Sequence, residues 1–111
     1  MSSELFIDEK TFIASINGAY CRRKSDALSE IAKNLMFPQH FGNNLDALED
    51  CLTDLSWIGK NKVILIINDF DYFLKDESSD LKETFLEIFK DTEKEWETSE
   101  TESKNFILVT N

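Results

Sequence analysis

Four carboxylates stand close together in the stretch that follows Asn44, and they are the side chains best able to do chemistry here. They are Asp46, Glu49, Asp50 and Asp54. The apolar residues between them recur at helical spacing, which predicts a helix with one buried stripe and an acidic opposite side. That stripe consists of Leu45, Leu48, Leu52 and Leu55, with Cys51 on its edge.

The charge pattern of this helix opposes its own stability. Asp46 lies three residues before Glu49 and four before Asp50, so like charges are neighbours on the helix surface. Each such pair destabilises the helix by about 0.2–0.5 kcal/mol. No Lys or Arg occurs between residues 33 and 60 to offset them. Two interpretations follow: the solvated face of a very acidic protein, or a docking face for a cationic partner. Composition alone does not choose between them.

An enzyme is a third interpretation, because clustered carboxylates can hold a metal ion or transfer protons. The rest of the sequence gives this little support. The chain has a single His, no His/Cys ligand spacing, and with three Gly and one Pro no glycine-rich phosphate-binding loop. We therefore expect no catalytic activity, no cofactor and no metal site.

The elements before the acidic helix follow from local signals. Residues 11–16 are β-branched and aromatic enough for a strand, and Asn17-Gly18 ends it in a turn. Ser25 or Asp26 is expected to cap a helix that ends near Met36, with Leu28, Ile31, Ala32 and Leu35 buried. Pro38 and Gly42 then mark a loop, after which Asn43 or Asn44 caps the acidic helix.

The elements after it complete an α/β pattern. Residues 63–67 are aliphatic on both faces, which is typical of a central parallel strand covered by helices. A short helix is expected over 69–74, with Phe70, Phe73 and Leu74 facing inward. A long helix capped by Ser79 or Asp80 should follow, and its buried residues are Leu81, Phe85, Ile88, Phe89 and Trp96. A closing strand is expected over 106–110. Strands joined by helices pair in parallel, so we predict a small three-stranded parallel sheet packed with helices.

Length and charge bound the organisation and the partners. With 111 residues, the chain is expected to form one domain over 11–111, preceded by an extension or short added strand over 1–10.

A net charge of −10 argues against nucleic acid or an anionic membrane as partner and favours a basic protein. We find no signal segment or membrane span and expect a cytoplasmic protein, monomeric when free, with reduced thiols. Cys21 falls in a connector, either exposed or packed.

Several motifs resemble the barstar family, the intracellular inhibitors of the ribonuclease barnase. They are Ile16-Asn17-Gly18, Ser25-Asp26, Pro38, Phe41-Gly42, Asn44-Leu-Asp-Ala-Leu48 and Asp50-Cys-Leu-Thr53. The resemblance covers most of residues 11–111, with added residues around 56–61 and 98–105. It implies a barstar-like fold and an inhibitor whose second helix and preceding loop plug a cationic ribonuclease active site.

The resemblance also implies roles for individual residues. Asp50 matches the family's central phosphate mimic, Asp46 a second interface aspartate, and Asp91 a third acidic contact that is one methylene shorter. The implied partner-binding set is His40, Phe41, Gly42, Asn44, Asp46, Glu49, Asp50, Thr53, Asp54 and Asp91. Local alternatives stay open: Asn44 as a cap, Gly42 as a backbone requirement, Asp46 as a dipole partner, and Asp91 as one acid among many.

Three departures from the family pattern bear on the partner. His40 stands where the family usually has Tyr, Glu49 replaces a Trp, and Asp54-Leu55 replace Gly-Trp. A rim with less apolar area and more acid implies a basic ribonuclease toxin other than barnase, and an immunity protein that protects the producing cell. The alternative function is an acidic binding module for a basic partner that is not a nuclease.

Overall fold

A computed structural model describes residues 10–98 and 104–111. The extension or added strand expected over residues 1–10 therefore lies outside the described residues except for Lys10. Most of the added residues expected around 98–105 lie outside them as well.

The sheet has three parallel strands in the order β1-β2-β3. They are β1 (Thr11–Asn17), β2 (Lys62–Asn68) and β3 (Asn105–Thr110). The register places Ile64 between Ile13 and Ile107. The predicted three-stranded parallel sheet of an α/β protein is thus confirmed, with the central strand where the aliphatic run predicted it.

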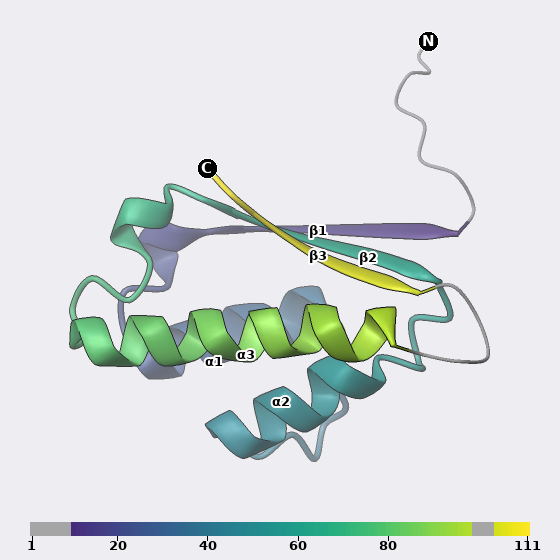
Figure 1. Cartoon of the computed structure of the whole chain (residues 1–111). Coiled ribbons are helices and arrows are strands. Elements are labelled where there is room, and N and C mark those ends of the chain that lie inside the picture. Colours follow the sequence, from purple (N-terminus) through teal and green to yellow (C-terminus); the bar gives the residue numbers. More distant parts are fainter. Residues whose placement is uncertain (1–9, 99–103) are drawn as a thin grey trace, which may run out of the picture.

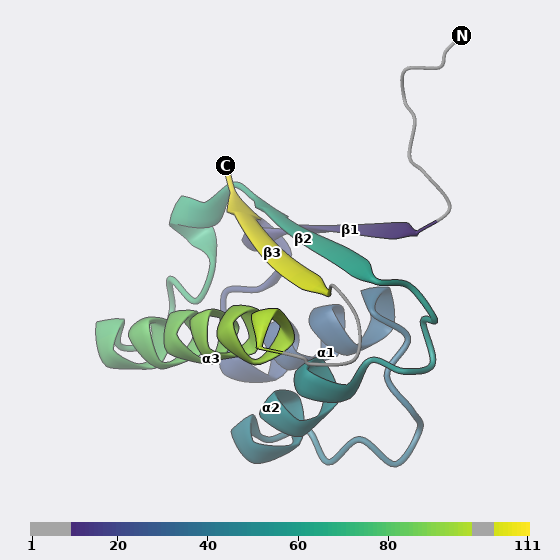
Figure 2. The same ribbon diagram turned by 45° about the vertical axis from the view of Figure 1, so that its right-hand side comes forward.

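The helices lie on one side of this sheet (Figures 1 and 2). The α-helices are α1 (Lys24–Asn34), α2 (Leu45–Asp54) and α3 (Ser79–Glu97), and the 3₁₀ turns are η2 (Gly18–Tyr20) and η3 (Phe70–Tyr72). Helices α1 and α3 pack on the strands, whereas α2 lies in an outer layer against α3. The described helices cover one face of the sheet, and along β2 the fully buried residues alternate with half-buried ones such as Ile64 and Ile66.

The core forms between the sheet and the helices. Val63, Leu65 and Ile67 of β2 are fully buried against it. The predicted stripes supply most of the rest, namely Leu28, Ile31 and Leu35 from α1 and its C-cap and Phe85, Ile88, Phe89 and Trp96 from α3, together with Phe73 and Leu74 after η3. Ala32, Phe70 and Leu81 are half-buried instead. No helix in the described part of the chain has the length and apolar character to cross a bilayer.

Two predicted helix caps are wrong: the error at α1 has a long-range cause, and the error at α3 is a shift of one residue. Helix α1 begins at Lys24, before Ser25 and Asp26, and the Lys24 N–H donates to Glu77 Oε2 at 2.9 Å. One of the free N–H groups of its first turn therefore finds its acceptor 53 positions away, and Arg23 at the N-cap position makes no side-chain capping bond. Helix α3 is capped by Ser78, whose Oγ accepts from the Leu81 N–H at 3.2 Å.

The predicted turn at Asn17-Gly18 is confirmed and explains the glycine. Asn17 Oδ1 accepts from the Ala19 N–H at 2.9 Å and opens η2. A Cβ at Gly18 would lie 2.8 Å from the Asn68 carbonyl oxygen, so a larger residue would push β2 away. This contact fixes how the chain leaves β1 toward α1.

Candidate functional site

Asn44 starts α2 and settles the choice between two adjacent asparagines. Its Oδ1 accepts from the Ala47 N–H at 2.8 Å, and its Nδ2 donates to the Gly42 carbonyl at 3.2 Å. A Cβ at Gly42 would sit 3.0 Å from that Nδ2. Asn44 therefore has a structural function at the helix N-terminus, and Gly42 leaves room for its side chain.

The buried side of α2 fixes how the helix is rotated. Leu48 and Leu52 are fully buried and Leu55, its left-handed C-cap, is 2% exposed. The Leu52 carbonyl also accepts a hydrogen bond from Trp96 Nε1 of α3 at 3.0 Å. Because this side is anchored to α3, the side chains on the other side must face away from the core.

The exposed side of α2 carries the acidic stripe, which we define as Asp46, Glu49, Asp50, Thr53 and Asp54. Each of the five is exposed. Within residues 10–98 and 104–111, none of its four carboxylates accepts a hydrogen bond or forms an ion pair; the ion pair found there joins Arg22 to Asp76 at 3.1 Å. Thr53 Oγ1 donates to the Glu49 carbonyl at 2.8 Å. The carboxylates are thus available to cations from outside the protein.

An aromatic cluster supports the loop that precedes α2. Phe41 packs edge-on against Phe37 with ring centroids 4.9 Å apart, and Phe37 packs against Trp57 at 6.0 Å. Trp57 Nε1 donates to the Leu35 carbonyl at 2.9 Å, and the Phe41 N–H donates to the Pro38 carbonyl at 3.0 Å. His40 is exposed in the turn that this last bond closes. The cluster holds the loop beside the start of α2.

The structure brings most of the predicted site residues together through chain continuity. His40, Phe41, Gly42 and Asn44 lie in the loop that runs directly into the acidic stripe. Phe41 is half-buried, so part of its surface serves the aromatic cluster. Asp91 is exposed on α3, the helix packed against α2, and no hydrogen bond or ion pair links it to α2 in the described residues.

The two thiols differ in burial. Cys21 is fully buried, which settles its open assignment, and burial raises the pKa of its thiol to about 12, with Glu30 and Asp26 adding to the effect. Cys51 is half-buried on α2, and its pKa is raised by burial and then by Asp50 and Asp54. Burial is the largest cause of the raised pKa at Cys51, and the smaller contribution of Asp50 and Asp54 reflects the negative potential that the acidic stripe creates.

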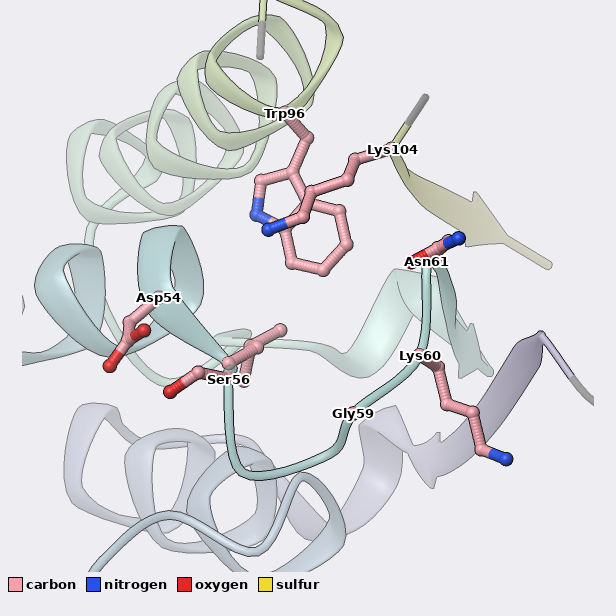
Figure 3. A pocket seen from close by; sticks show the side chains of 8 residues that line it. Asp54, Ser56, Gly59, Lys60, Asn61, Trp96 and Lys104 are labelled. Atoms are coloured by element: carbon pink, nitrogen blue, oxygen red, sulfur yellow. The ribbon is translucent and has the colours of Figure 1, made fainter. Parts of the chain in front are cut away.

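Sequence reasoning missed two adjoining pockets at the C-terminal end of α2, which share Trp96 of α3 and Lys104 before β3 and together form one hollow. Asp54 of the acidic stripe lines the pocket shown in Figure 3, and Thr53 lines the other. The Lys104 ammonium sits 5.5 Å from the centre of the Trp96 ring. No motif signals this site, because its residues come from separate elements. Among the described residues, no three His, Cys, Asp or Glu are placed to hold a metal ion.

One comparison with known families covers nearly the whole described fold. A family model described as "Barstar (barnase inhibitor)" matches residues 11–110. The chain belongs to the barstar family, and the resemblance seen in its motifs is confirmed. The family's general activity is the inhibition of a ribonuclease.

Proposed function

We propose, from its membership of the barstar family, that this chain blocks a basic ribonuclease by inserting α2 and residues 37–44 into the enzyme's active site. A ribonuclease active site is cationic because it must bind RNA phosphates. A carboxylate can accept the Arg and Lys contacts that a phosphate oxygen accepts, including the paired hydrogen bonds of an Arg guanidinium. The acidic stripe would therefore take the place of RNA.

The observation that carries this proposal is the unpaired state of the acidic stripe. Asp46 gains some stability from the helix N-terminus, but Asp50 at mid-helix has no capping role and no hydrogen bond to any described residue. Folding alone does not explain a carboxylate there. Insertion beside cationic groups of a partner does explain it, since such pairs become strong once water is excluded.

The stripe also bears on the kind of ribonuclease. Where the family pattern has Trp and Gly, this chain has Glu49 and Asp54, and both are exposed. Additional carboxylates and less apolar area at the edge of the contact suit an enzyme whose rim is more basic than that of barnase. We propose a secreted ribonuclease toxin as the partner, with this chain acting as the immunity protein in the cytoplasm of the cell that makes it.

The test begins with affinity capture of the ribonuclease from the source cells, followed by inhibition assays with two variants. Asp50→Ala removes the central carboxylate and should raise the inhibition constant at least about a hundredfold, because the enzyme's cations would be left buried without a partner. Glu83→Ala removes the same charge from an exposed position near the start of α3 and should stay within about twofold of wild type.

Circular dichroism should show both variants folded, since neither side chain contributes to the core. Equal inhibition by Asp50→Ala and wild type would remove Asp50 from the contact and refute the phosphate-mimic mechanism. Capture of a basic protein without nuclease activity would favour the alternative of a general acidic binding module.

A further inference from the structure

We propose that the hollow lined by Thr53, Asp54, Trp96 and Lys104, which we call the Lys104 hollow, receives a carboxylate of the bound ribonuclease. This inference rests on the proposed function, because it adds a contact to the same interface. Its sign is opposite to that of the acidic stripe: here the inhibitor supplies the cation and the enzyme supplies the anion.

Continuity with the acidic stripe is the first argument. Thr53 and Asp54 are the last two members of the stripe and also lie on the edge of the hollow. A protein surface that covers α2 from Asp46 to Asp54 therefore also reaches Trp96 and Lys104. A standard interface buries about 800 Å² on each partner, far more than one exposed face of a ten-residue helix offers.

The charge of the hollow is the second argument. No Lys or Arg occurs from residue 34 to residue 59, and two of the lysines that follow, Lys60 and Lys104, line the hollow. Figure 3 shows the Lys104 amine over the Trp96 ring, whereas the Lys60 amine points away. In the described part of the chain, Lys104 forms no ion pair, and its charge is met by the face of the indole alone.

The rigidity of the hollow is the third argument. Trp96 is 3% exposed, and its Nε1 donates a hydrogen bond to the Leu52 carbonyl of α2. The indole therefore forms a fixed floor that attracts the ammonium of Lys104 at 5.5 Å. A lysine that is already held in place loses less side-chain entropy when a partner binds, so an ion pair there adds more to affinity than a free surface lysine would.

A cation of the enzyme at this position would have the opposite effect on binding from a carboxylate. Asp54 and Glu95 also lie on the edge of the hollow, and the proposed enzyme is basic. If the enzyme presented a cation here, Lys104 would repel it, and removing the Lys104 charge would tighten binding. If the enzyme presents a carboxylate, removing that charge must weaken binding.

The experiment uses the full chain and the ribonuclease captured as described above. Lys104→Met keeps an aliphatic stem over Trp96 and removes the charge. We expect it to dissociate about fivefold faster in surface plasmon resonance, the loss typical of one partly exposed ion pair. Lys75→Met is the matched control, since its ammonium sits 4.9 Å from the centre of the Tyr72 ring just before the start of α3, at the other end of that helix from Trp96. It should stay within twofold of wild type.

An unchanged or slower dissociation rate for Lys104→Met overturns the proposal, and thermal unfolding midpoints close to wild type establish that both variants are folded. A second arm identifies the partner group. Lys104→Glu should bind more weakly still, and changing one acidic residue of the ribonuclease to Lys should restore its binding. Failure of every such change to restore binding also counts against the proposal.

The Asp50→Ala result separates the two ideas. If Asp50→Ala binds poorly and Lys104→Met binds normally, the ribonuclease contact stands and the Lys104 hollow is not part of it. If Asp50→Ala binds normally and Lys104→Met binds poorly, the hollow is a contact but the acidic stripe is not a phosphate mimic.

Discussion

At the scale of single residues, the useful distinction is between polar groups that the fold employs and those that it leaves free. Asn44 is employed twice, as acceptor for the Ala47 N–H and as donor to the Gly42 carbonyl. Asp50 forms no hydrogen bond or ion pair with any described residue. Cys21 is a third case, because its thiol is buried in the core and its ionisation makes the free energy of unfolding depend on pH.

The pH dependence of stability should report on Cys21. Its pKa is raised by burial from 9.0 to about 12 in the folded chain. Below pH 9 the thiol is protonated in both states and its contribution is constant. Above pH 9 the unfolded chain loses the proton that the folded chain keeps, so the free energy of unfolding falls as pH rises toward 12, by at most about 1.4 kcal/mol per pH unit from this group.

Urea unfolding of wild type and Cys21→Ala between pH 8.5 and 10.5 measures this effect. The variant should be less stable throughout because of the cavity, but its stability should fall less steeply above pH 9. Cys51 and the lysines are present in both proteins, so their titration cancels in the comparison. Parallel curves would show that Cys21 does not titrate as its burial requires.

At the scale of elements, the sequence predicted structure well wherever the signal was local. The leucine spacing and Asn44 predicted α2, and the aliphatic run predicted β2. The start of α1 was wrong because its first N–H finds Glu77, a partner that no local window contains. The cap of α3 was wrong by one residue because Ser78 and Ser79 are equivalent in a pattern and differ in backbone geometry alone.

The candidate site divides in the same way. The acidic stripe lies within one helix, so its members could be placed on one side from their spacing. The Lys104 hollow depends on the packing of α2 against α3 and on the entry into β3, and neither arrangement is written in a local pattern. Trp96 follows Asp54 by 42 residues along the chain, and Lys104 follows it by 50.

The N-terminus of α2 should depend on the oxygen of the Asn44 side chain. Asn44→Ala removes the acceptor for the Ala47 N–H and should lower the free energy of unfolding by about 1 kcal/mol. Asn44→Asp keeps an acceptor and adds a charge that suits a helix N-terminus, so it should remain close to wild type. Urea unfolding at neutral pH measures both. Equal destabilisation of the two variants would assign the effect to the lost donor to Gly42 instead.

At the scale of the whole molecule, the net charge of −10 acts over distances longer than any contact. Self-repulsion among carboxylates costs the folded state some stability, and the same field draws a basic protein toward the chain. The described α-helices lie on one side of the sheet, and α2, whose exposed side carries the acidic stripe, is in the layer farthest from the sheet (Figure 2). The fold thus acts as a rigid support for one charged helix.

The central claim is that this helix and an RNA phosphate occupy the same place on the ribonuclease. The most direct measurement is competition between the chain and a ribonucleoside monophosphate for the captured enzyme, with the Kd of the chain measured by isothermal titration calorimetry. The account predicts mutually exclusive binding, with the apparent Kd for the chain rising in proportion to nucleotide concentration once the nucleotide's own Kd is exceeded. A Kd that does not change at saturating nucleotide would mean that the chain binds elsewhere and would contradict the account.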